Sequence, residues 1–153
     1  MLDGDLEKNA LDFIKSVQEN KLPTTSKKYE YGKYAIKATI KCNSKRICNI
    51  YMGKNSFDVQ PVAEYTDKFN AYVNDLELKS IIWDNVQKCG RCQNNTCLKQ
   101  SGQTKETFRG FNKIIFGKEI DNTCKHGNLM FRNPNDNEFD CIQKIVYFNK
   151  QCL

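Results

Sequence analysis

The sequence predicts an α+β fold, in which an antiparallel sheet of three or more strands is flanked by N-terminal, central and C-terminal helices and accompanied by a cysteine knuckle. Two observations predict it. Apolar residues recur at helical spacing near both ends of the chain, and they alternate with other residues along Tyr34–Cys42, as in a half-buried strand. At 153 residues the chain can bury one sizeable core, so we expect a single domain spanning residues 1–153.

The first expected element is an amphipathic helix near Leu6–Glu19. Its apolar residues recur at helical spacing: Leu6, Ala10, Phe13, Ile14 and Val17. Pro23 lies beyond the end of this segment, where a proline is common because it cannot continue a helix. We therefore expect this helix to cover a core.

Two paired strands are expected next, at Tyr34–Cys42 and near Arg46–Met52. For their apolar residues to share one side of the sheet, the loop around Asn43 must contain an odd number of residues. That register brings Cys42 near Cys48 or places Ile40 opposite Cys48. It predicts that the two cysteines lie on the same face, as core residues first and as a candidate bridge second.

A third strand is expected at Phe57–Tyr65, where Pro61 favours an edge position or an early end. Thr66 or Asp67 then caps a helical region. Its apolar stripe slips near Asn74–Asp75, so either one helix bends there or two helices meet. The part from Leu76 to Lys88 is predicted to be helical, with Gly90 as its left-handed cap.

The C-terminal part predicts a β-hairpin followed by a helix. Lys113–Lys118 is expected as a strand, Glu119–Cys124 as a turn and Asn128–Phe131 as the second strand, which places Cys124 at the tip. Asn133-Pro134 has the form of a helix start. The apolar positions that follow predict the buried face of this helix: Phe139, Ile142, Ile145 and Val146.

The candidate site is a cysteine cluster made of Cys89, Cys92, Cys97 and Cys124, with His126 as a substitute ligand. Two residues between Cys89 and Cys92 let both sulfurs point onto one ion, as in a metal knuckle. Four ligands of this type favour Zn²⁺, and a site with four protein ligands is structural because no position is left for water. The four cysteines are expected to converge in space.

Two alternatives for the cluster remain open. Cys89 and Cys92 also have the spacing of a redox dithiol, although a thiolate at the end of the expected helix is disfavoured by the helix dipole. In the second alternative, the cysteines are reduced thiols without a bound metal, and some of them are packed in a core. A Cys-His nucleophile formed by Cys124 and His126 lacks an identifiable third group that would orient the pair.

Charge and targeting signals bear on location and partners. The N-terminus lacks the features of a signal peptide, and no stretch is long enough to span a membrane, so we expect a cytoplasmic protein without membrane contact. The formal charge is +6, but the lysines are dispersed along the sequence and only four residues are arginine: Arg46, Arg91, Arg109 and Arg132. Nucleic acid is therefore not the expected partner, and duplex DNA binding should be weak.

The C-terminal half resembles a family of small uncharacterised bacterial proteins that combine a β-hairpin with this cysteine pattern. The resemblance rests on Cys-Gly-Arg-Cys…Cys, on Ile-Phe-Gly-Lys-Glu-Ile-Asp-Asn-Thr-Cys and on Phe-Arg-Asn-Pro, and it covers roughly Tyr29–Val146. It implies that the cysteines of the candidate site belong to a recurring pattern that does not clearly include His126. It implies no activity.

Enzyme signatures are scarce in this sequence. His126 is its one histidine, and it contains no phosphate-binding glycine loop, nucleophile elbow or metalloprotease motif. The leading hypothesis is a non-enzymatic cytosolic binding module with a structural zinc site, which recognises a small molecule or a protein partner between sheet and helices. The alternatives are a thiol redox protein that uses Cys89 and Cys92, and a zinc-stabilised nucleic-acid-binding protein.

Overall fold

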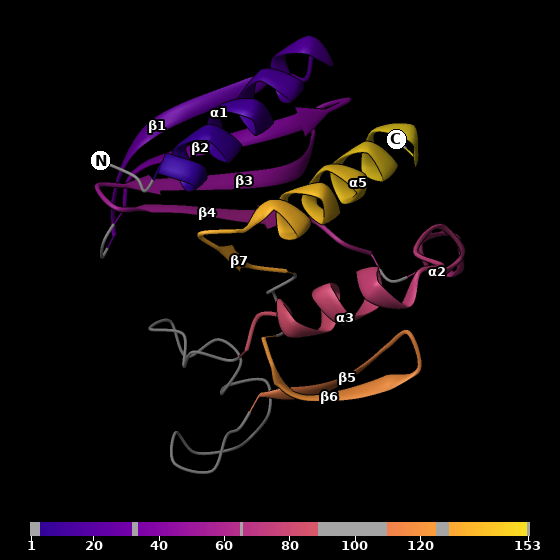
Figure 1. Ribbon diagram of the computed structural model, residues 1–153. Coiled ribbons are helices and arrows are strands. Elements are labelled where there is room, and N and C mark those ends of the chain that lie inside the picture. The colour runs from indigo at the N-terminus through magenta and orange to yellow at the C-terminus, as the bar shows by residue number, and fades with distance from the viewer. Residues whose placement is uncertain (1–3, 32–33, 65, 89–109, 125–128, 153) are drawn as a thin grey trace. The chain divides into compact units, whose positions relative to one another are not determined.

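The computed structural model describes residues 4–31, 34–64, 66–88, 110–124 and 129–152 (Figure 1). The chain divides into two compact units, residues 1–64 with 130–153 (unit 1) and residues 65–129 (unit 2). The elements of unit 1 are α1 (Gly4–Glu19), β1 (Thr24–Tyr31), β2 (Tyr34–Cys42), β3 (Lys45–Gly53), β4 (Ser56–Pro61), β7 (Phe131–Arg132) and α5 (Asp136–Cys152). Those of unit 2 are α2 (Asp67–Tyr72), α3 (Leu76–Asp84), β5 (Phe111–Ile115) and β6 (Lys118–Thr123).

Unit 1 contains a five-stranded antiparallel sheet in the order β1-β2-β3-β4-β7. Together with its flanking helices, this sheet confirms the predicted α+β class. The sequence did not predict β1, because its residues Thr-Thr-Ser-Lys-Lys-Tyr-Glu-Tyr lack an apolar alternation. This strand lies at the sheet edge, where pairing with β2 on one side is enough to hold a largely polar segment.

The β2–β3 hairpin has the predicted register but not the predicted loop. Ile40 lies opposite Cys48, as expected, and Cys42 shares their face because it is two residues from Ile40. The turn is formed by Asn43 and Ser44, both with positive φ (46° and 65°), so it holds two residues rather than an odd number. A register shift leaves Ile47 as an extra residue in β3. Cys48 and Ile50 therefore still face the same side of the sheet as the apolar residues of β2.

The core of unit 1 lies between the sheet and helices α1 and α5. Phe139 of α5 lies with its ring centroid 6.0 Å from that of Phe13 in α1 and 5.9 Å from that of Phe57 in β4. Both helices therefore pack on the same face of the sheet (Figure 1). The predicted buried face of the last helix is confirmed, since Phe139, Ile142, Ile145 and Val146 are all buried.

The N-terminus of α5 is closed by a reciprocal capping box. The Asn135 side chain accepts a hydrogen bond from the Glu138 amide (3.0 Å), and the Glu138 carboxylate accepts one from the Asn135 amide (2.9 Å). The helix starts just after the predicted Asn133-Pro134 signal. Asn133 has φ of 46°, and its backbone and side chain both bond to Phe57, so this corner ties α5 to β4.

In unit 2, two short helices meet where the apolar stripe slips. Thr66 caps α2 and Asp75 caps α3, each by accepting a hydrogen bond from a backbone amide of the first turn. The prediction that the second helix continues to Lys88 is wrong, because α3 ends at Asp84. Val86 and Lys88 instead form isolated antiparallel bridges with Leu129 and Thr123.

The hairpin of unit 2 turns earlier in the chain than predicted. β5 and β6 are joined through Phe116 and Gly117, whose positive φ values (51° and 76°) are the backbone signature of a tight hairpin turn. Cys124 therefore follows the end of β6, at the open end of the hairpin, and the prediction that it lies at the tip is wrong. Phe131, expected in the returning strand, belongs to β7 and pairs with β4.

Candidate functional site

The predicted cysteine site lies mostly outside the described residues. Cys89, Cys92, Cys97 and His126 belong to segments that the structure does not describe, and Cys124 is the one predicted ligand that it places. Within the described part of the chain, no three or more His, Cys, Asp or Glu side chains are grouped so as to hold a metal ion. The convergence of the four cysteines stays a prediction.

Cys124 is buried and its backbone is held firmly. Its amide donates a hydrogen bond to the Gln87 carbonyl (2.9 Å), and its carbonyl accepts one from Lys113 Nζ (3.0 Å). The neighbouring residue Thr123 bridges to Lys88, the residue that directly precedes Cys89 in the chain. The fold therefore fixes Cys124 beside the segment that leads into the first half of the predicted knuckle.

Cys48 and Cys141 are core thiols. Burial raises the pKa of Cys48 well above its usual value and raises the pKa of Cys141 to about 12, so both side chains are protonated at neutral pH. Cys42, Cys124 and Cys152 are likewise free cysteines. The interpretation of Cys42 and Cys48 as core residues before bridge partners fits their free thiols, with Cys42 half-buried near the Lys150 carbonyl.

A second candidate site, which sequence reasoning missed, is the sheet face opposite α1 and α5. We call it the polar face. Its residues follow from the strand register and from the contacts of Tyr29 and Tyr34: Thr25, Lys27, Tyr29, Tyr34, Lys37, Thr39, Lys41, Arg46, Asn49, Tyr51, Asp58, Gln60 and Arg132. The alternation in Tyr34–Cys42 could have indicated which residues of β2 lie on this face, but the edge strand β1 was not predicted.

Three tyrosines form the centre of the polar face. The ring of Tyr51 lies between those of Tyr29 and Tyr34, at centroid distances of 5.6 and 5.5 Å, in tilted contacts. Lys37 Nζ lies 5.2 Å from the Tyr51 centroid and 5.8 Å from that of Tyr29. The result is an aromatic cluster with a cation above it, each member of which is half-buried.

Side chains on three strands form a hydrogen-bonded row beside the tyrosines. Thr39 donates to the Asn49 amide oxygen (3.0 Å), and Asn49 in turn donates to the Gln60 amide oxygen (3.0 Å). Tyr51 donates its hydroxyl proton to the same Gln60 oxygen (3.1 Å). These bonds satisfy the buried Asn49 and hold the hydroxyl of the central tyrosine in one position.

Tyr34 and Asp58 form a partly buried hydrogen bond at the other side of the cluster. A register shift in β2 pairs Tyr34 with Gly53 and so directs its ring onto the polar face, where its hydroxyl donates to Asp58. Burial raises the pKa of Tyr34 above its usual value, and the hydrogen bond to Asp58 and the negative charge of that residue raise it further, while Arg132 lowers it. Tyr34 is therefore neutral up to high pH in the folded protein.

Tyr34→Phe should make the free energy of unfolding less dependent on alkaline pH. An unfolded tyrosine ionises near pH 10, whereas the folded-state pKa of Tyr34 is higher, so its contribution is complete below about pH 10 and declines as the pH rises. At neutral pH the variant should lose about 1–2 kcal/mol, because Asp58 loses a donor. Urea unfolding of both proteins from pH 7 to 11 checks this, and parallel declines above about pH 10 would contradict it.

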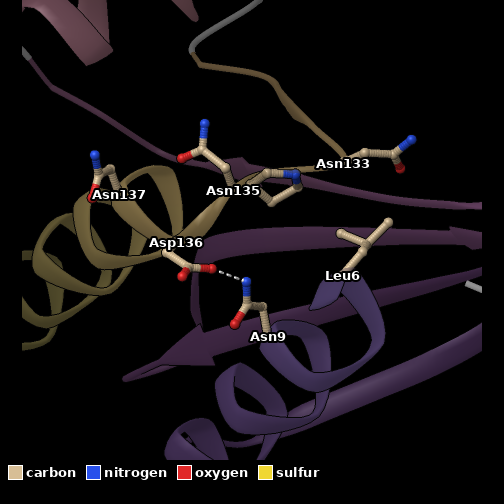
Figure 2. A pocket seen from close by; sticks show the side chains of 7 residues that line it. Leu6, Asn9, Asn133, Asn135, Asp136 and Asn137 are labelled. Carbon is tan, nitrogen blue, oxygen red and sulfur yellow. Dashed lines mark hydrogen bonds between the residues drawn. The ribbon is translucent and has the colours of Figure 1, made fainter. Parts of the chain in front are cut away.

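A surface hollow of about 500 Å³ lies between the start of α1 and the start of α5. Figure 2 shows Asn9 of α1 and Asp136 of α5 facing one another across it, joined by a hydrogen bond. Asn133 bonds to β4 and Asn135 caps α5. Because these polar groups already hold the helices and the sheet in place, we assign the hollow a structural role.

Comparisons with protein-family models, with curated proteins and with solved structures found no significant match. The resemblance to the bacterial family with the cysteine pattern therefore stays a prediction. Among the helices of the described residues, each is too short or too polar to cross a membrane.

Proposed function

We propose that this chain is a non-enzymatic, cytosolic binding module whose ligand is an anion docked on the polar face. One observation carries the proposal: on this face the sheet gathers cations that are dispersed in the sequence. Among the side chains that the structure describes, its cations are Lys27, Lys37, Lys41, Arg46 and Arg132, and its acidic residue is Asp58. The free thiols of the core fit the reducing environment of a cytosol.

Burial strengthens the charge argument. Asp58 is fully buried and accepts a hydrogen bond from Tyr34, whereas Lys27, Arg46 and Arg132 are exposed. A ligand approaching this face therefore meets positive charge first. Anionic small molecules and acidic surfaces of protein partners both fit these charges.

We further propose that Cys89, Cys92, Cys97 and Cys124 hold a structural Zn²⁺, with His126 as the substitute ligand. The support is the Thr123–Lys88 bridge, which fixes the backbone next to Cys124 beside the residue that precedes Cys89. Four sulfur ligands would leave no open position on the metal, so its role is to stabilise unit 2.

A thiol redox function of Cys89 and Cys92 is the second candidate, and the position at which α3 ends favours it. The sequence predicts a helix that ends near Cys89, where the helix dipole disfavours a thiolate. In the structure α3 ends at Asp84 and a bridge at Lys88 follows, so the C-terminus of this helix is not at Cys89.

Heparin retention tests the anion-binding surface. We expect the protein to bind a heparin column at physiological salt and Lys27→Glu/Arg46→Glu to elute at clearly lower salt, because a polyanion contacts several of these cations at once. Lys8→Glu/Lys15→Glu on α1 is the control, since it changes the net charge equally. Equal elution of the two double variants, or a wild type that flows through, would contradict the proposal.

A further inference from the structure

We propose that the anionic ligand is a single-stranded nucleic acid, whose bases stack on the tyrosines of the polar face and whose phosphates contact the surrounding cations. This inference rests on the proposed function and names the ligand class of the same surface. Two independent features support it: the charge of the face, and an aromatic cluster that positive charge alone does not require.

The tyrosines are placed to accept bases. Tyr29, Tyr34 and Tyr51 come from three different strands and are half-buried, so part of each side chain remains accessible to solvent. The hydroxyl groups of Tyr34 and Tyr51 are held by Asp58 and Gln60. A ring held in this way loses little conformational freedom when a base stacks on it, which favours binding.

The cations are placed to contact the backbone of such a strand. One row of residues crosses all five strands, because each residue pairs with the next one on the neighbouring strand. The row consists of Lys27, Lys37, Tyr51, Asp58 and Arg132. At about 4.8 Å between neighbouring strands this row spans roughly 19 Å. Positive side chains therefore lie on both sides of Tyr51 in this row, and a short nucleic-acid strand can contact the ring and the cations together.

A single strand fits this surface better than a duplex or an acidic protein. Bases inside a duplex are stacked on one another and offer no free ring faces, and phosphate contacts alone do not use the tyrosines. Carboxylates of an acidic protein would pair with the lysines but would not stack. All three ligands fit the positive charge of the polar face, and the tyrosines favour the single strand over the duplex and the acidic protein.

The test compares two probes with equal phosphate charge. A fluorescein-labelled oligothymidylate and an abasic oligodeoxynucleotide of the same length are titrated with the full chain at physiological salt, and binding is followed by anisotropy. We expect the oligothymidylate to bind about tenfold more tightly or better, because only its bases can stack. Tyr29→Leu should weaken thymidylate binding by about tenfold and leave abasic binding unchanged.

Further variants separate stacking from folding and from charge. Tyr29→Phe keeps the ring and should restore thymidylate binding, whereas Lys27→Gln should weaken binding of both probes by a similar factor. Tyr72→Leu, at an exposed residue of α2, serves as the control and should leave both affinities unchanged. Equal binding of the two probes, or tighter binding of a duplex of the same sequence, would overturn this inference while the anion-binding function stands. If neither probe nor heparin binds, both proposals fail.

Discussion

Phe57→Ala should lower the free energy of unfolding of unit 1 by about 3–5 kcal/mol, the usual cost of removing a buried phenylalanine. The Phe57 side chain is 1% exposed and contacts Phe139, which in turn contacts Phe13. The truncation would leave a cavity where the sheet meets both helices, and the ring contacts are lost as well. Urea unfolding followed by circular dichroism measures the change.

Leu11→Ala is the matched control for this substitution. Leu11 lies on α1 in the same unit but is 60% exposed, so its truncation should change the free energy of unfolding by no more than about 0.5 kcal/mol. Equal losses in the two variants would show that Phe57 is not a central core residue. A loss confined to Phe57→Ala would support the placement of α1 and α5 on one sheet face.

Removal of zinc should have the second large effect. Protein purified under reducing conditions is expected to contain a stoichiometric amount of Zn²⁺, and chelation should unfold unit 2 while unit 1 keeps its structure. Zinc binding in small zinc-finger peptides is worth about 10–16 kcal/mol. Among the described contacts of the hairpin in unit 2 are a hydrogen bond from Trp83 of α3 to the Ile115 carbonyl and a ring contact between Phe69 of α2 and Phe116, and a metal would add to these. Metal analysis, thiol counting and amide exchange before and after chelation measure these changes.

Two cysteine variants separate a metal ligand from a core thiol. Cys124→Ser should lose the bound zinc, whereas Cys48→Ser should keep it even though Cys48 is equally a buried thiol, because Cys48 lies in unit 1 and outside the cysteine pattern. Zinc-free protein with the same stability before and after chelation would contradict the metal proposal. Reversible titration of two thiols in that protein would then favour the redox alternative.

Local sequence patterns predict most of the helices and strands and their buried faces. The helical stripes around Phe13 and Phe139 each need only local spacing, and the alternation in Tyr34–Cys42 needs only the period of a strand. The cap at Thr66 is similarly local, because a cap involves residues within one turn. The last helix begins at Asp136, just after the predicted Asn133-Pro134 signal. These predictions hold because neighbouring residues decide them.

Other features depend on contacts between residues that are far apart in the sequence. β1 is a strand because β2 pairs with it, and α3 ends at Asp84 because Val86 and Lys88 bridge to residues much later in the chain. The shift that directs Tyr34 onto the polar face, and the row that joins Lys27 to Arg132, exist only once the strands are in register. Charges that are scattered in the sequence become neighbours because antiparallel pairing places residues from five segments side by side.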